Sequence, residues 1–184
     1  MSEVSRNYVI GLGANLGDRL ATLCSALAAL GQCGAVRAVS AVYETAPVGP
    51  AQPDFLNAAV LLESVLSPRA LLAELLGIER SHGRERRERW GPRTLDLDLL
   101  CAGDLVLDEP GLSLPHPHLP RRAFALMPLL DVVPEARDAR SGTTYAEHLA
   151  TLEHHGVRRL ETPDGWRAPE RLLSLQGERN TSVV

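Results

Sequence analysis

The sequence has no lysine, because all nineteen basic residues among its 184 residues are arginine. This absence excludes three kinds of catalytic machinery that need a lysine: a Schiff base, the lysine of a P-loop and the strand lysine of protein kinases. Cysteines are also few. Cys24, Cys33 and Cys101 are widely spaced without a Cys-x-x-Cys pattern, which argues against a disulfide framework and a thiolate zinc site. We therefore expect a cytoplasmic protein.

Features of membrane proteins and of nucleic-acid-binding proteins are missing as well. No apolar run approaches the roughly 18 residues of a membrane-spanning helix, and residues 1–7 show no signal-peptide pattern. The formal net charge is −4, so the arginines do not belong to a general basic surface. We expect no membrane partner, no nucleic acid partner and a chain that acts as a monomer.

The apolar content of 45% is that of an ordinary globular protein, and the length suits one well-buried domain. From residue 162 onward the composition becomes polar, with one short apolar patch. We expect a catalytic domain over residues 1–161 and a partly ordered tail over residues 162–184.

The clearest chemical pattern is an alternation of leucine and aspartate in an expected strand. Because side chains of a strand alternate between its faces, Asp96 and Asp98 point the same way, opposite to Leu95, Leu97 and Leu99. Residues two apart in a strand are about 6.6 Å apart, so both carboxylates can reach one divalent ion or a close pair of ions. Mg²⁺ in phosphoryl-transfer sites takes one or two carboxylates together with substrate phosphates. The pattern predicts a magnesium site that works on a polyphosphate.

Five arginines precede this strand within ten residues: Arg84, Arg86, Arg87, Arg89 and Arg93. Guanidinium groups bind phosphate oxygens with paired donors and keep their charge at any working pH. The alternative is an edge strand with a solvated acidic face after a charged loop. Two carboxylates, five arginines and Trp90 in one segment favour the functional interpretation.

Hydrophobic periodicity predicts the order strand, helix, strand, strand, helix, strand, followed by a hairpin strand and two helices. The expected strands cover residues 8–12, 36–43, 55–62, 95–100 and 105–107, and the expected helices 20–30, 68–79, 121–133 and 144–155. Ser67-Pro68 is a helix start, with an N-cap followed by proline. The order is that of a ferredoxin-like βαββαβ core. We predict an α+β fold with a mainly antiparallel sheet and helices packed on it in three α/β/α layers.

Glycines at positions 11, 13 and 17 follow the start of the first expected strand. Their spacing, G-x-G-x-x-x-G, differs from the dinucleotide fingerprint, and glycines in such segments often serve tight geometry alone. We interpret them as a turn into the first helix.

Residues 89–100, Arg-Trp-Gly-Pro-Arg-Thr-Leu-Asp-Leu-Asp-Leu-Leu, closely resemble the signature of the 6-hydroxymethyl-7,8-dihydropterin pyrophosphokinase family of folate biosynthesis. Further blocks resemble the family's other motifs in the same order: residues 10–17, residues 43–50 with 52–60, and Pro115-His116 with Arg122 and Phe124. The resemblance implies an enzyme that transfers pyrophosphate from ATP to the hydroxymethyl group of the pterin and releases AMP.

The resemblance also implies roles for single residues. Asp96 and Asp98 would hold two Mg²⁺ ions that bridge the phosphates of ATP, the co-substrate, and Arg84 and Arg93 would be catalytic arginines on those phosphates. The further ATP-binding positions that it implies are Glu79, Arg86, Arg87, Arg89, Trp90, Leu99, Ser113, His116 and Arg122. Phe55 and Phe124 resemble the pair that stacks on the pterin ring, and Asn57 the residue that bonds its edge. Thr45, Ala46 and Val48 would line the adjoining loop.

Two other functions fit the residues without the resemblance. One is a different metal-dependent phosphoryl or nucleotidyl transferase, or a phosphohydrolase, on a ferredoxin-like scaffold, and the other is a non-catalytic domain that binds a small ligand. Phe55, Asn57 and Phe124 favour a pterin enzyme over both. We predict no zinc site at His116-Pro117-His118.

Overall fold

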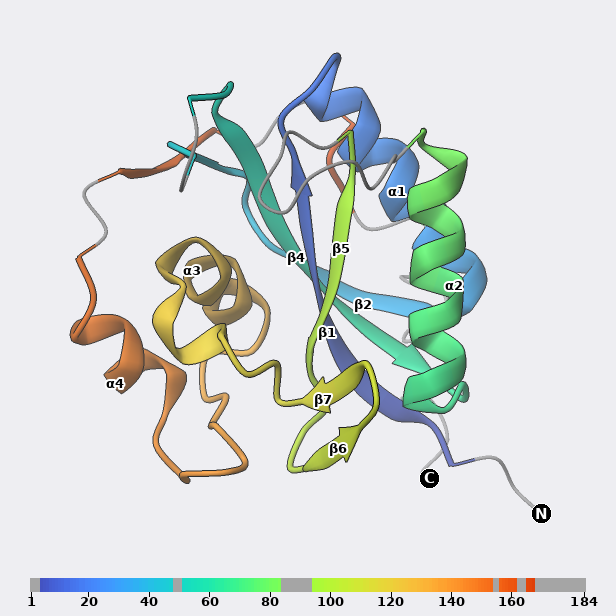
Figure 1. Cartoon of the computed structure of the whole chain (residues 1–184), viewed down its shortest axis with the longest axis vertical. Coiled ribbons are helices and arrows are strands. Elements are labelled where there is room, and N and C mark those ends of the chain that lie inside the picture. Colours follow the sequence, from blue (N-terminus) through green and yellow to red (C-terminus); the bar gives the residue numbers. More distant parts are fainter. Residues whose placement is uncertain (1–3, 48–50, 84–93, 154–155, 162–164, 168–184) are drawn as a thin grey trace, which may run out of the picture.

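The computed structural model describes residues 4–47, 51–83, 94–153, 156–161 and 165–167. One antiparallel sheet lies between two layers of helices (Figure 1), so the predicted α+β class and the three layers are confirmed. The strands are β1 (Arg6–Ala14), β2 (Ala35–Val39), β3 (Tyr43–Thr45), β4 (Phe55–Ser64), β5 (Asp96–Cys101), β6 (Leu107–Glu109), β7 (Leu112–Leu114) and β8 (Val157–Arg159). The helices are α1 (Arg19–Cys33), α2 (Pro68–Ser81), the 3₁₀ helix η1 (Leu119–Arg121), α3 (Ala123–Val132) and α4 (Tyr145–Ala150).

The main sheet has the order β5-β1-β4-β3-β8, and β2 also pairs with β4. β1 occupies one edge of β4 along its length, so β2 and β3 share the other edge. The single strand expected over residues 36–43 is therefore wrong. The chain leaves the strand conformation at Ser40, whose Oγ accepts a hydrogen bond from the Ala59 amide at 2.8 Å and fills the gap between the two short strands.

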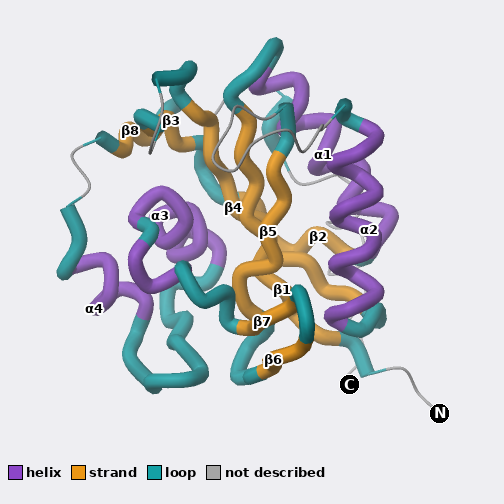
Figure 2. The backbone as a smooth tube through the Cα atoms, viewed as in Figure 1, coloured by secondary structure: helices purple, strands orange, loops and turns teal. Residues whose placement is uncertain are grey.

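Each face of the sheet has its own core. Tyr8, Ile10 and Leu12 of β1 belong to a buried cluster with side chains of α1 and α2, whereas Val9 belongs to a second cluster with α3 and α4. In Figure 2 the strands run between α1 and α2 on one side and α3 on the other. The alternation of β1 residues between the clusters follows from the two-residue period of a strand.

The helix starts follow local sequence signals more closely than the helix ends do. Ser67 caps α2 as predicted, because its Oγ accepts a hydrogen bond from the Ala70 amide at 3.2 Å. The expected helix over residues 121–133 starts two residues late, because Arg122 has an extended backbone that separates η1 from α3. The expected helix over 144–155 ends early, at Ala150, and α2 continues to Ser81.

The remaining differences concern strands. β1 continues to Ala14 instead of ending at residue 12, and the hairpin strand expected at 105–107 begins only at Leu107 and pairs with β7 in a separate small sheet. Across the described ranges, no helix has the length and apolar character that a bilayer span requires.

Candidate active site

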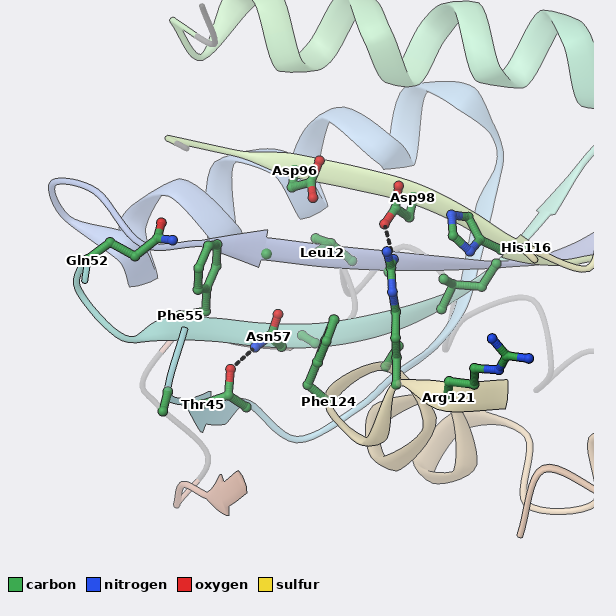
Figure 3. Close-up of a pocket in the computed structure, with 17 residues that line it drawn as sticks. Leu12, Thr45, Gln52, Phe55, Asn57, Asp96, Asp98, His116, Arg121 and Phe124 are labelled. Carbon is green, nitrogen blue, oxygen red and sulfur yellow. Dashed lines mark hydrogen bonds and ion pairs between the residues drawn. The ribbon is translucent and has the colours of Figure 1, made fainter. Parts of the chain in front are cut away.

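A cavity of about 350 Å³ lies between the sheet and the start of α3 (Figure 3). Its lining comes from β1, β4, β5, the end of β3, the start of α3 and the segments before β4 and α3. The lining residues are Gly11, Leu12, Gly13, Thr45, Ala46, Gln52, Phe55, Asn57, Ala58, Asp96, Asp98, Leu100, His116, Arg121, Arg122, Phe124 and Ala125. Segments that are far apart in the sequence, between residues 11 and 125, therefore meet at one site.

The two aspartates of β5 both line this cavity. Leu97, between them, is buried with the α1–α2 cluster on the opposite face, so the predicted alternation is confirmed. The carboxylates are partly exposed and are supplied by an edge strand of the sheet. Among the described residues no group of three or more His, Cys, Asp or Glu side chains is placed to hold a metal, and the two carboxylates share one face of β5.

Gly11 and Gly13 form the floor of the cavity beside the aspartates. Gly11 pairs with Asp98 and Gly13 with Asp96 in the β1–β5 ladder. A Cβ on Gly13 would lie 3.2 Å from Asn57 Oδ1 and 3.8 Å from Asp96 Cβ, a tight contact in the middle of the site. The interpretation of these two glycines as a turn was wrong, because both lie inside β1. Gly17, with φ of 64°, does belong to the turn before α1.

A guanidinium group lies over the carboxylate end of the cavity. Arg122 Nη1 is 3.7 Å from Asp98 Oδ2, and the Arg122 guanidinium carbon is 5.8 Å from the centre of the Phe124 ring. The Arg122 and Asp98 side chains are 20% and 39% exposed, so solvent weakens the attraction between them.

His116 also lines the cavity (Figure 3) and is held through its backbone, whose amide donates to the Leu100 carbonyl at 2.7 Å. Burial, and next the positive charge of Arg122, lower the pKa of His116 to about 4. The imidazole is therefore neutral near pH 7. Its Nδ1 accepts a hydrogen bond from the His118 amide at 3.2 Å, which leaves Nε2 as a donor.

The other end of the cavity is apolar and has buried amide and hydroxyl groups. Asn57 Nδ2 donates to Thr45 Oγ1 at 2.7 Å, and these residues are only 7% and 5% exposed. Phe55 from β4 and Phe124 from α3 flank Asn57 (Figure 3). The adjoining wall is held by Asn15, whose Nδ2 donates to Gln52 Oε1 at 3.0 Å. A flat ring with polar edge groups fits such an arrangement.

The structure brings together most of the site residues predicted from the sequence that it describes. In the lining are Thr45, Ala46, Phe55, Asn57, Asp96, Asp98, His116, Arg122 and Phe124. Val48, Arg84, Arg86, Arg87, Arg89, Trp90 and Arg93 lie outside the described residues.

Three predicted ATP-binding residues do not line the cavity. Glu79 is 2% exposed on α2, and its carboxylate accepts a hydrogen bond from the Leu97 amide at 2.8 Å. Leu99 is buried in the α1–α2 cluster, and Ser113 lies in β7 opposite Asp108. Their role in ATP binding stays a prediction.

Sequence reasoning missed several lining residues. Gly11 and Gly13 had a usable signal, since two glycines spaced by two inside an apolar strand leave one face of it bare. Gln52 lies in the resembling block of residues 52–60 but was given no role, and Arg121 of η1 had no signal, because it reaches the cavity only through the tertiary fold.

An α+β fold with paired carboxylates, a guanidinium and an apolar end in one cavity fits an enzyme that transfers phosphate groups to a small substrate. The model of the family described as 7,8-dihydro-6-hydroxymethylpterin-pyrophosphokinase matches residues 9–134. The chain belongs to this family.

Curated relatives support the same assignment, and each carries the name 2-amino-4-hydroxy-6-hydroxymethyldihydropteridine pyrophosphokinase. The Synechocystis sp. protein is 45% identical over 147 residues, which are 79% of this chain and 75% of that protein. The Methylorubrum extorquens protein is 41% identical over 161 residues, 86% of this chain and 100% of that protein. The Pseudomonas aeruginosa protein is 43% identical over 160 residues, 85% of this chain and 98% of that protein.

Solved structures with the same fold include HPPK-DHPS chains. A crystal structure of HPPK-DHPS in complex with substrates has a TM-score of 0.70 at 13% identity. The match covers 89% of this chain and 48% of the HPPK-DHPS chain. A Plasmodium falciparum HPPK-DHPS triple mutant has a TM-score of 0.63 at 17% identity, and the match covers 81% of this chain and 44% of the mutant chain. This chain thus spans about half the length of those chains, and at such identities the likeness shows the fold alone.

Proposed function

We propose that this protein transfers pyrophosphate from ATP to the hydroxymethyl group of 6-hydroxymethyl-7,8-dihydropterin, giving AMP and the pterin diphosphate in folate biosynthesis. Membership of the family carries the proposal. The cavity supports it, because one end suits a flat ring with polar edges and the other end suits a polyphosphate.

The pterin occupies the end lined by Phe55, Phe124 and Asn57. The two rings supply flat apolar surfaces for the bicyclic ring. Since Asn57 Nδ2 already donates to Thr45, its Oδ1 is oriented to accept a hydrogen bond from the amino edge of the pterin. Thr45 and Ala46 form the adjoining wall, and Val48 is proposed to extend it.

Asp96 and Asp98 are the residues that would hold Mg²⁺. Their oxygen donors suit this hard cation, and two carboxylates leave positions for water and substrate phosphates. Bound there together with ATP, two such ions would neutralise charge on the phosphates. The chain's own contribution is to keep both carboxylates on the cavity face of β5, beside a floor without side chains at Gly11 and Gly13.

In the reaction the pterin hydroxyl oxygen bonds to the β-phosphorus, the bond from that phosphorus to the bridging oxygen of AMP breaks, and the hydroxyl proton is released. The protein contributes by alignment and by stabilising charge. Arg122 and the neutral His116 supply donors at the carboxylate end of the cavity. From the sequence we propose Arg84 and Arg93 as further cations on the phosphates, together with Arg86, Arg87, Arg89 and Trp90.

The test is release of AMP from ATP with Mg²⁺, measured with and without 6-hydroxymethyl-7,8-dihydropterin. We expect AMP that depends on both the pterin and the metal, and loss of it in excess EDTA. ADP or free phosphate as product would instead indicate another phosphotransferase or a hydrolase, and binding without turnover would indicate a binding domain.

We further propose that the chain acts as a monomer in the cytoplasm. Its three cysteines are free thiols, which suits a reducing compartment. Sedimentation equilibrium should give the mass of one chain, and twice that mass would contradict the proposal of a monomer.

A further inference from the structure

The chain after α4 passes from one face of the sheet to the other. Tyr145 of α4 is buried in the cluster with α3, β8 lies at the outer edge of the sheet beside β3, and Trp166 is buried in the cluster with α1 and α2. We call residues 156–161 and 165–167 the strap. The strap lies beyond the residues that the family model matches, which end at 134.

The strap is bonded to β3 along the whole length of that strand. β8 pairs with β3 from Tyr43↔Arg159 to Thr45↔Val157. The pairing continues at both ends, because the Leu160 amide donates to the Val42 carbonyl at 2.9 Å and the Ala46 amide donates to the Gly156 carbonyl at 3.4 Å. Thr45 and Ala46, which line the cavity, are thus held by backbone hydrogen bonds from the strap on the other edge of β3.

Charges reinforce this contact. Arg158 of the strap forms an ion pair with Glu44 of β3, and Glu44 is also 3.0 Å from Arg19 at the start of α1. Arg19 in turn donates to the Asp54 carbonyl at 2.7 Å, one residue before Phe55. The outer surface of β3 is therefore linked both to the strap and to the segment that leads into the pterin end of the cavity.

Trp166 anchors the strap at the gap between β2 and β3. Its indole is 2% exposed, and Nε1 donates to the Ser40 carbonyl at 2.8 Å. The Oγ of Ser40 also accepts a hydrogen bond from the Ala59 amide of β4. The anchor therefore lies at the residue where the edge of β4 changes partner from β2 to β3.

β3 depends on such support because it is short. It has three residues and pairs with β4 only from Tyr43↔Asn57 to Thr45↔Phe55. A strand of this length with one open edge opens easily, since few hydrogen bonds hold it. Opening would separate Thr45 from Asn57 and release the orientation of the Asn57 amide.

We propose that the strap is a positioning element for the pterin end of the cavity, and that Trp166 is its anchoring residue. It holds β3 against β4, so that Thr45 and Ala46 stay in place beside Asn57. This inference rests on the proposed function for the identity of the ligand. The carboxylate end is built on β5, at the opposite edge of the sheet, and does not depend on the strap.

The test compares Trp166→Ala and Trp166→Phe with the unchanged chain in steady-state AMP formation. We expect Trp166→Ala to raise KM for the pterin about tenfold while KM for ATP and kcat change less than about twofold, because binding of the pterin is weakened equally in the ground state and the transition state. Trp166→Phe keeps the ring but loses the donor to Ser40, so we expect a rise in pterin KM of about two- to fourfold. Leu160→Pro, which removes the amide donor to Val42, should also raise the pterin KM and leave KM for ATP nearly unchanged.

Leu30→Ala is the matched control. Leu30 is fully buried in the same cluster as Trp166, but on α1, which packs on β1, β2 and β4. Leu30→Ala should lower the thermal stability and leave the pterin KM unchanged. The proposal is overturned if Trp166→Ala only lowers stability, or if Leu30→Ala raises the pterin KM by the same factor. If Trp166→Ala does not fold, Trp166→Phe and Leu160→Pro decide between these outcomes.

Hydrogen exchange separates this proposal from the proposed function, because it needs no turnover. In the Trp166 variants the amides of residues 43–46 should exchange at least about tenfold faster, while those of β1 keep their protection. Unchanged exchange at residues 43–46 would overturn the strap proposal even in an active enzyme. Failure of the unchanged chain to form AMP would overturn only the proposed function.

Discussion

The two ends of the cavity are built in opposite ways. At the pterin end, Asn57 and Thr45 are buried and joined by a 2.7 Å hydrogen bond. At the carboxylate end, Asp98 and Arg122 are partly exposed and 3.7 Å apart, beyond ordinary hydrogen-bond distance. Buried neutral groups with short bonds are rigid, whereas exposed charges reorganise readily around a charged ligand. The pterin end is therefore suited to recognition, and the carboxylate end to charge stabilisation.

The largest expected effect comes from Asp98→Ala at the carboxylate end. We expect kcat to fall by at least about 10²–10³-fold, since one of the two carboxylates proposed to hold Mg²⁺ is removed. The fold should survive, because the side chain is 39% exposed and faces the cavity. AMP formation and circular dichroism measure the two effects. Asp104→Asn, at an exposed turn after β5, is the matched control and should keep full activity.

Next in size is Asn57→Ala at the pterin end. An unmade buried hydrogen bond costs about 1–3 kcal/mol, which corresponds to a rise in pterin KM of roughly 5- to 150-fold. KM for ATP should stay unchanged, because Asn57 lies away from the carboxylates. Thr45→Val should give a smaller rise by releasing the Asn57 amide. Equal effects on both substrates would show that the two ends are not separate.

A smaller effect is expected from Phe124→Leu, which tests the contact between the two ends. The ring lines the pterin end and also lies 5.8 Å from the Arg122 guanidinium carbon. Loss of the aromatic face should raise the pterin KM roughly 2- to 10-fold, with a lesser decrease in kcat. Phe124→Tyr keeps the ring and should restore both constants, and no recovery would contradict stacking.

The smallest effect concerns the titration of His116. Its pKa is about 4 in the folded protein and 6.5 ordinarily, so the unfolded chain binds more protons between these values. The neutral His116 imidazole therefore stabilises the folded protein fully above pH 6.5. This contribution to the free energy of unfolding is lost as the pH falls toward 4. The thermal midpoint of the unchanged chain should thus decrease more between pH 7 and pH 4 than that of His116→Asn. Proton NMR should give a His116 pKa near 4, and a value above 6 would contradict the burial argument.

Local sequence signals predicted much of this molecule. The Leu-Asp alternation placed Asp96 and Asp98 on one face of β5, and Ser67-Pro68 marked the start of α2. The break at Ser40 was missed, because it depends on the pairing along β4: β2 pairs with residues 60–63 and β3 with residues 55–57, and Ser40 lies between the two pairings. No local sequence signal indicated the burial of Trp166, since its neighbours in sequence are polar.

The sequence by itself determined which side chains share a face and which family motifs the chain carries, because periodicity and short motifs are local properties. Only the tertiary structure decided that the β5 carboxylates, the β4 amide and the α3 ring line one cavity, and that the strap supports β3. Such contacts join residues far apart in the chain, and their geometry depends on how the layers pack.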